Sequence, residues 1–158
     1  MFHTVYLGAK ARHAGATLGM VAAIGLSAAA YAAETWLTLA GDPADPGAHY
    51  VQVNPAAIDL QGDLRIIPVR INRARLWTFR DSVQFRSVET DVRIDCVRHT
   101  ADYVKAAFYA QPDFRGTPFK LASYAADGAH PMEFEDMADN PTARIIKAAC
   151  SARSVISN

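Results

Sequence analysis

One stretch of the chain alternates between two kinds of side chain over ten residues. Successive side chains of a β-strand point to opposite faces, so a period of two predicts a strand and rules out a helix here. We therefore predict a half-buried antiparallel strand over residues 87–97, in a sheet with one dry and one solvated face. The set expected in the core is Val88, Thr90, Val92, Ile94 and Cys96, and the solvated set is Ser87, Glu89, Asp91, Arg93 and Asp95.

Six other segments have the residue composition of short strands. Gly, Pro, Asn and Asp cluster between them, as expected for turns. Pro68 lies inside one of these segments and cannot donate a backbone hydrogen bond, so we expect that strand to lie at a sheet edge or to carry a bulge. The predicted strands cover residues 36–40, 49–53, 64–71, 75–79, 102–111 and 119–124.

A helix start signal stands near the end of the chain, where the capping residue Asn140 precedes Pro141. We predict a helix over residues 142–151. Ile146 and Cys150 are four residues apart and share a face of that helix, which we expect to meet the sheet. The predicted fold class is α+β, an antiparallel sheet of about five or six strands with a C-terminal helix packed on one face.

The N-terminal segment has the organisation of a secretory signal peptide. It contains no acidic residue, and a basic cluster at positions 10–13 precedes an uncharged stretch that ends in a small-residue pattern. We predict cleavage between Ala32 and Ala33; an uncleaved membrane anchor is the alternative, since the stretch is about long enough to span a bilayer. The expected organisation is a signal peptide over residues 1–32, a globular domain over 33–150 and a C-terminal tail over 151–158.

Both cysteines, Cys96 and Cys150, lie in the predicted mature domain. An exported protein matures in an oxidising compartment, so we predict a disulfide between them, which would tie strand to helix and contribute roughly 4 kcal/mol. The alternative is a metal or redox site that uses Cys96 and His99. No cysteine stands near the cleavage site, so we expect a periplasmic, secreted or cell-surface protein without a lipid anchor or a membrane span after cleavage.

Composition excludes several classes of protein. The formal net charge is zero and 51% of the residues are apolar, which argues against a disordered chain and against a nucleic-acid binder. After the predicted cleavage, 14 basic and 16 acidic residues remain, a net charge of −2. The charge is unevenly divided, because residues 64–98 carry a net +4 and residues 99–140 a net −4.

All the basic residues of segment 64–98 are arginines, and several stand close to aromatic residues. Arginine binds carboxylates, phosphates and sulfates through two hydrogen bonds and stacks on aromatic rings, so this combination predicts a surface for a glycan, an anionic polymer or an acidic partner. The alternative is that these arginines pair with the acidic segment across the same sheet. The candidate binding residues are Arg70, Arg73, Arg75, Trp77 and Arg80.

The sequence contains no catalytic motif that we can identify. There is no nucleophile elbow and no glycine-rich phosphate loop after a strand, and the three mature histidines, at positions 49, 99 and 130, are scattered. We therefore expect a protein that is not an enzyme and that needs no cofactor. His49 and Tyr50 are the only adjacent candidates for ligands of a haem group.

The order of several short motifs resembles the surface-adhesin protein E-like family of Gram-negative envelope proteins. The resemblance covers roughly residues 35–150. The motifs that carry it are Trp36 at the head of a strand, Tyr50-Val51-Gln52-Val53-Asn54 before a turn ending in Ile58, Phe85-Arg86-Ser87, Ile94-Asp95-Cys96, Ala107-Phe108-Tyr109 with Pro112 and Gly116, and Ala148-Ala149-Cys150.

The resemblance implies a six-stranded antiparallel sheet and a C-terminal helix, tied by a disulfide at Cys96 and Cys150. The best-known member of that family is a surface adhesin that binds host extracellular-matrix and plasma proteins, and haem binding has been associated with it. Our main hypothesis is an exported binding module that contacts host extracellular-matrix proteins or another anionic macromolecule. The alternatives are a periplasmic small-ligand binder, for example of haem, and an envelope structural protein without a soluble ligand.

Overall fold

The computed structural model of the protein describes residues 35–45, 47–79, 82–125, 130–134, 137 and 140–152. The predicted signal peptide and most of the predicted tail lie outside the described residues, so both stay predictions. No helix in the described part of the chain is long and apolar enough to cross a membrane.

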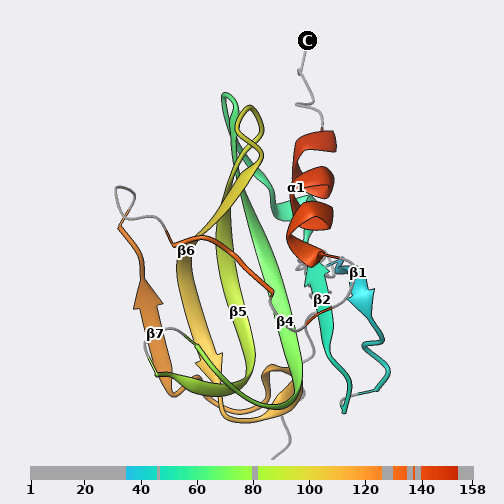
Figure 1. Ribbon diagram of the computed structural model, residues 1–158, viewed down its shortest axis with the longest axis vertical. Helices are drawn as coiled ribbons and strands as arrows, with labels where there is room; N and C mark the ends of the chain where they lie inside the picture. The colour runs from blue at the N-terminus through green and yellow to red at the C-terminus, as the bar shows by residue number, and fades with distance from the viewer. Residues whose placement is uncertain are drawn as a thin grey trace, which may run out of the picture. The chain divides into compact units, whose positions relative to one another are not determined.

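In the described part of the chain, seven antiparallel strands form one sheet, and a single α-helix follows them (Figure 1). The strands are ordered β1-β2-β4-β5-β6-β7, and β3 pairs with β4 as well. This arrangement confirms the predicted α+β class. The elements are β1 (Leu37–Gly41), β2 (Tyr50–Val53), β3 (Asp59–Gln61), β4 (Leu64–Thr78), β5 (Gln84–Asp95), β6 (Thr100–Tyr109), β7 (Lys120–Ser123) and α1 (Pro141–Ser151), with short 3₁₀ turns η1 (Pro55–Ala57) and η2 (Pro112–Phe114).

The short strand β3 was not among the predicted strands, and a turn was expected at residues 61–63. Gln61 pairs with Leu64, so only two residues connect β3 to β4. One of them, Gly62, has a φ of +63°, which suits glycine in a tight hairpin. The sequence signal for a turn was therefore correct, but the turn belongs to a hairpin.

The prediction for Pro68 is wrong, because β4 lies inside the sheet between β2 and β5, and its pairing with β5 shifts beyond Asn72 and not at Pro68. The Pro68 carbonyl accepts a hydrogen bond from the Asn54 N–H, just where β2 ends. In an antiparallel strand, the N–H and C=O of one residue point toward the same neighbour. The missing N–H therefore faces the connection between β2 and β3, where neither strand continues and no ladder bond is lost.

The predicted strands 64–71 and 75–79 are one long strand with an irregularity. The pairing of β4 with β5 shifts between Asn72 and Trp77. Beyond this point the strands form an arm, residues 73–79 and 82–85, that curls across the front of the sheet (Figure 1). Phe79 at the end of the arm packs edge-on against Tyr103, with ring centroids 5.2 Å apart. The arm therefore covers part of the sheet that the helix does not reach.

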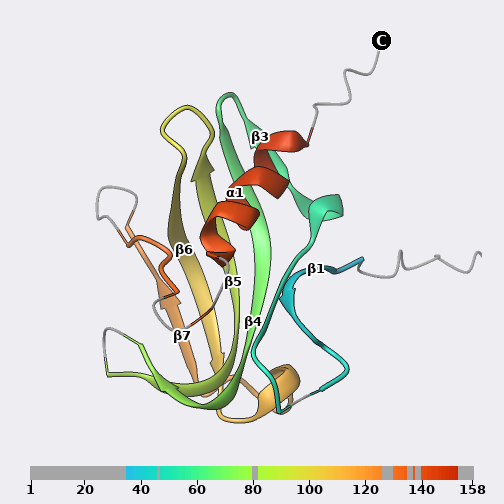
Figure 2. The same cartoon turned by 45° about the vertical axis from the view of Figure 1, so that its right-hand side comes forward.

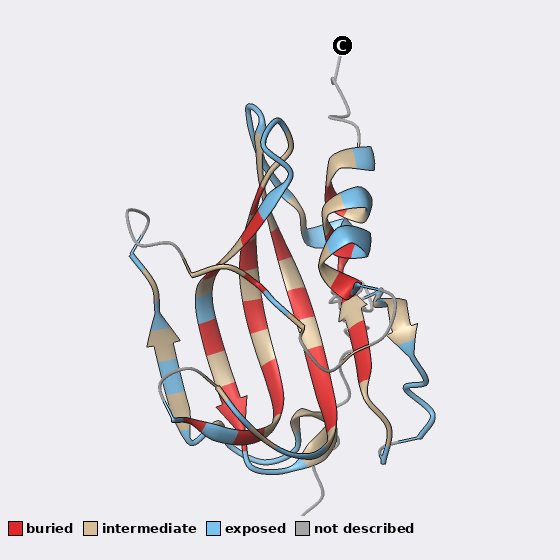
Figure 3. Ribbon diagram, viewed as in Figure 1, coloured by how far each residue is buried: buried red, intermediate tan, exposed pale blue. Residues whose placement is uncertain are grey.

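The core lies between the sheet and its two covers, α1 and the arm. Val88, Val92 and Ile94 of β5 are buried, which confirms the predicted core face of this strand. Buried and intermediate positions alternate along the central strands (Figure 3). Ile145 and Ala149 of α1 are fully buried in the same cluster, and the turned view shows α1 lying against the sheet (Figure 2). Burial of a side chain such as Ile145 stabilises the fold by roughly 1.5–3 kcal/mol.

A disulfide ties the helix to the sheet, as predicted. Cys96, just after β5, is bonded to Cys150 in the last turn of α1, with Cα atoms 5.6 Å apart. Both cysteines pack against the core. Because Cys96 is consumed in this bond, it is not available as the thiolate ligand of a metal site with His99.

Candidate functional site

The face of the sheet opposite α1 carries a continuous row of side chains. The row follows the pairing of strands β1, β2, β4, β5, β6 and β7, so one position on each strand contributes to it. These positions alternate with the buried ones on β4 and β5 and therefore point away from the core. We call this side the open face, and its row is Thr38, Gln52, Arg70, Glu89, Ala107 and Leu121.

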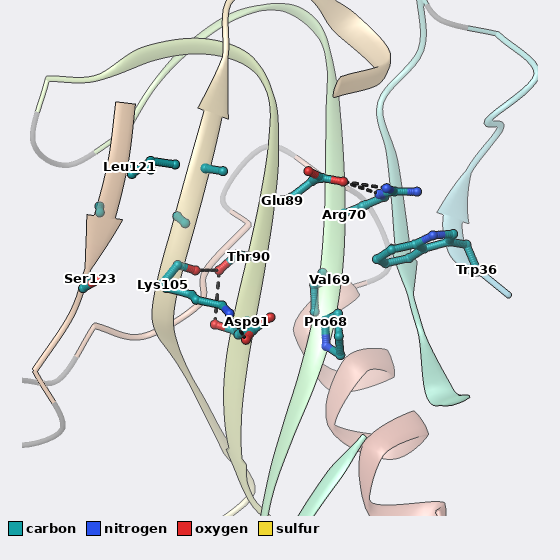
Figure 4. A pocket seen from close by; sticks show the side chains of 13 residues that line it. Trp36, Pro68, Val69, Arg70, Glu89, Thr90, Asp91, Lys105, Leu121 and Ser123 are labelled. Atoms are coloured by element: carbon teal, nitrogen blue, oxygen red, sulfur yellow. Dashed lines mark hydrogen bonds and ion pairs between the residues drawn. The ribbon is translucent and has the colours of Figure 1, made fainter. Parts of the chain in front are cut away.

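The open face is hollowed by a pocket of about 380 Å³, which we call the groove. Trp36 stands at one end of it and Leu121 at the other, with charged side chains from β4, β5 and β6 between them (Figure 4). Leu121 is 73% exposed, the highest value among the large hydrophobic side chains of the described residues. The groove therefore brings together two apolar side chains from opposite edges of the sheet.

Arg70 is held in one orientation at the Trp36 end of the groove. Its Nε and Nη2 atoms lie 2.7 Å and 2.6 Å from Oε1 of Glu89. Its guanidinium carbon lies 4.0 Å from the centroid of the Trp36 ring and 5.0 Å from that of Phe114. These contacts fix the indole and the guanidinium against each other, because cation–π contacts add to the ion pair.

The second oxygen of Glu89 extends this network to β6. Oε2 of Glu89 accepts a hydrogen bond of 2.5 Å from the Tyr109 hydroxyl. Burial, and then the hydrogen bond and negative charge of Glu89, raise the pKa of Tyr109 to about 12, although the positive charge of Arg70 opposes the shift. Tyr109 is therefore a neutral donor at physiological pH, and both oxygens of Glu89 are engaged.

A second ion pair lies beside the first in the groove. Nζ of Lys105 on β6 lies 2.9 Å from Oδ2 of Asp91 on β5 (Figure 4). The Lys105 side chain is 65% exposed, so this pair contributes little to stability and its polar atoms are accessible to a ligand. The groove thus holds two cations and two carboxylates, and its charge sums to zero.

One end of the open face is closed by η2. The backbone N–H of Asp113 donates to Asn72, and that of Phe114 donates to Ser87, at 3.0 Å and 2.9 Å. Ser87 was predicted on the solvated side of its strand; it does point away from the core, but η2 buries it completely. The groove is confined to the part of the open face that η2 leaves uncovered.

Among the described residues of the predicted basic-aromatic set, Arg73 and Trp77 lie together, but they do not share a surface with Arg70. Arg70 lies on the open face. Arg73 is only 4% exposed, and its guanidinium carbon lies 4.4 Å from the centroid of Trp77, which packs against the core. Arg75 is exposed on the arm, and Arg80 lies outside the described residues. The irregularity after Asn72 separates these positions, because it turns the arm away from the open face.

The alternative that these arginines pair with the acidic segment 99–140 stays a prediction. Glu89, which pairs with Arg70, belongs to the same segment as Arg70, 64–98, and stands directly opposite on the neighbouring strand. Trp36 and Leu121, which line the groove, were not predicted as site residues. The alternation in β5 did place Glu89 and Asp91 on the solvated face, but it carried no information on which distant strands would flank them.

Tyr50, the candidate haem ligand, is engaged in another contact. It is 3% exposed, and its hydroxyl donates to Oδ1 of Asp113 at 3.0 Å. Burial, followed by the hydrogen bond to Asp113, raises the pKa of Tyr50. No group of three or more His, Cys, Asp and Glu side chains that could hold a metal ion occurs among the residues that the structure describes.

Comparison with known proteins agrees with the fold. No curated protein matches the chain. The family model of surface-adhesin protein E matches residues 36–151, a range that begins at Trp36 and ends at the last residue of α1. The match therefore spans all seven strands, the disulfide and the groove. The chain belongs to the surface-adhesin protein E family.

Proposed function

We propose that this protein is an exported, non-enzymatic binding module that contacts extracellular-matrix macromolecules through its open face. Membership of the surface-adhesin protein E family indicates an adhesin-like binding role and a cell-surface or exported protein. The targets and the surface that binds them belong to the proposal.

The observation that supports the open face most directly is the unequal covering of the sheet. One face is buried beneath α1 and the arm, whereas the other exposes Trp36, Leu121 and two ion pairs around the groove. Trp36 and the exposed Leu121 line the same groove with polar groups between them, and this mixture of apolar and polar groups is typical of an interaction surface. The rigid support of a disulfide-tied sheet also lowers the entropy lost on binding.

The experiment is a binding assay with immobilised fibronectin and collagen. We expect the substitution Leu121→Asp to weaken binding by at least about tenfold, since it places a charge on the apolar wall. The control is Val97→Asp at the turn between β5 and β6, because Val97 is 70% exposed and Leu121 is 73% exposed. This control variant should bind as the wild type does.

The same assay separates the open face from the arm. Arg75→Ala and Leu76→Asp change exposed residues of the arm and leave the groove intact. Loss of binding in these variants, together with full binding by Leu121→Asp, would place the adhesive surface on the arm and contradict our proposal. Equal binding by all variants would exclude both surfaces.

A further inference from the structure

We propose that the groove binds an uncharged glycan, so that this protein recognises the neutral carbohydrate of its macromolecular targets. The inference rests on the proposed function of the open face, and it names the chemistry of the ligand. Three properties of the groove carry it: an immobilised indole, two ion pairs whose charges cancel and of which Lys105–Asp91 is the more accessible, and a size suited to a small ligand.

The indole of Trp36 supplies an apolar surface for the C–H face of a sugar ring. Trp36 lines the groove, and the guanidinium of Arg70 holds its ring in place at 4.0 Å. Arg70 is itself fixed by Glu89 at 2.6 Å. A ring that is already ordered loses little conformational entropy when a ligand packs on it, and this favours binding of a weakly apolar ligand such as a sugar.

The ion pair of Lys105 and Asp91 supplies a donor and an acceptor for the hydroxyl groups of a sugar. A sugar hydroxyl both donates and accepts, so a single hydroxyl can donate to Asp91 and another can accept from Lys105 without breaking their 2.9 Å contact. Hydrogen bonds to charged groups are stronger than those between neutral groups. Hydroxyls placed along the groove would therefore be well satisfied.

The balance of charge favours a neutral ligand over an anionic one. Arg70 and Lys105 are both neutralised by carboxylates within the groove, at 2.6 Å and 2.9 Å. A sulfate or carboxylate group would have to compete with Glu89 and Asp91 for the same cations and would be repelled by them. The groove thus lacks the excess of positive charge that an anionic polymer requires.

The dimensions of the groove agree with this class of ligand. Its volume of about 380 Å³ lies within the range of about 300–1,000 Å³ that is common for small-molecule sites. The small side chain of Ala107 stands between Glu89 and Leu121 in the cross-strand row. A larger residue at this position would fill the space next to the carboxylate.

The first experiment applies the purified protein to an array of neutral glycans built from hexose, N-acetylhexosamine and fucose units, with sulfated and sialylated forms of the same glycans beside them. We expect binding to at least one neutral glycan and weaker binding to its charged forms. Binding only to charged glycans, or to none of the glycans, would overturn the inference.

The second experiment locates the bound glycan by fluorescence. The chain has two tryptophans, Trp36 and Trp77, so in the Trp77→Phe variant the emission comes from Trp36 alone. Titration with the neutral glycan identified on the array should change this emission in a saturable way. An unchanged emission, despite binding on the array, would place the glycan outside the groove and contradict the inference.

Variants of the groove complete the test. Asp91→Asn and Trp36→Ala should each weaken glycan binding by about tenfold or more, whereas Val97→Ala should not change it. Trp36 directly precedes β1, so Trp36→Ala tests the strand as well as the groove. Asp91→Asn is expected to fold normally, because the partner of Asp91, Lys105, is 65% exposed. Thermal unfolding checks that both variants are folded. Unchanged glycan binding in folded Asp91→Asn and Trp36→Ala proteins would refute the site.

Periodate oxidation of immobilised fibronectin separates this inference from the proposed function. Periodate cleaves vicinal diols of sugars, so binding should fall when the fibronectin is oxidised. If binding survives oxidation but is lost in Leu121→Asp, the open face binds protein and the glycan inference fails. If Leu121→Asp binds untreated fibronectin normally, the proposed function itself fails.

Discussion

Arg70 and Glu89 stand opposite each other on β4 and β5, and Nη2 of Arg70 lies 2.6 Å from Oε1 of Glu89. This pair joins the two ends of the polar network on the open face. Arg70 also contacts the Trp36 ring, and Glu89 also accepts the hydroxyl of Tyr109. A single cross-strand pair thereby orders side chains from the N-terminal edge of the sheet to β6.

We expect Glu89→Gln to lower the free energy of unfolding by about 1–2 kcal/mol, because it weakens hydrogen bonds from a charged and a phenolic donor. The matched variant is Asp91→Asn on the same strand, whose partner Lys105 is 65% exposed. That change should cost no more than about 0.5 kcal/mol. Urea denaturation measures both values, and equal losses would show that the Glu89 network has no special role in stability.

The pKa of Tyr109 predicts a loss of stability in alkali. An unfolded tyrosine ionises near pH 10, whereas burial and the contact with Glu89 raise the pKa of Tyr109 in the folded protein to about 12. The resulting stabilisation is fully present below pH 10 and is lost as the pH rises toward 12. The free energy of unfolding should therefore fall less steeply between pH 10 and 11 in Tyr109→Phe than in the wild type. Parallel pH profiles would contradict this assignment.

Local patterns were sufficient to predict much of the fold. The alternation of Val88, Val92 and Ile94 with charged residues gave the correct faces of β5, since burial of alternate residues is what generates the pattern. Cys96 followed on the core face, within reach of Cys150. Pro68 was misplaced because the effect of a missing N–H depends on which neighbour that atom faces, and this is a property of the assembled sheet.

The candidate site was less predictable, because residues far apart in the chain form it. Trp36 and Leu121 line the same groove because of the strand order of the sheet, and no local sequence pattern specifies that order. The arginine cluster was adjacent in sequence, yet the irregularity after Asn72 sends Arg73 toward Trp77 and leaves Arg70 on the open face. Residues that are close in sequence do not share a surface when the strand that carries them bends between them.

The lowered pKa of Asp95 predicts that the fold loses stability in acid. Hydrogen bonds from the backbone N–H groups of Arg98 and Val97 lower the pKa of Asp95, and burial opposes this shift. A lowered pKa stabilises the fold above the unfolded value near 3.9, and the effect disappears as the pH falls through the folded value. Asp95→Asn should therefore lower the Tm at pH 6 more than at pH 3. A difference in Tm that does not depend on pH would contradict the prediction.

Export is testable by mass spectrometry and surface labelling. If the predicted signal peptide is removed between Ala32 and Ala33, the intact mass of protein recovered from the cell envelope corresponds to residues 33–158. For an adhesin-like role, intact cells should also bind an antibody raised against the folded domain. A protein confined to the periplasm would be inaccessible to the antibody and would refute adhesion to host macromolecules.

The disulfide should hold α1 on the sheet. Cys96 and Cys150 are 54 residues apart, so chain-entropy arguments give the crosslink roughly 4 kcal/mol of stabilisation. We expect the free energy of unfolding of the Cys96→Ser/Cys150→Ser protein, measured by urea denaturation, to be lower than that of the wild type by an amount close to this value. Ile145→Val is the control for loss of helix packing alone. It should lower the free energy of unfolding by only about 0.5–1.5 kcal/mol, because valine retains most of the buried volume of Ile145. A double serine variant as stable as the wild type would show that packing of α1 holds the helix without the crosslink.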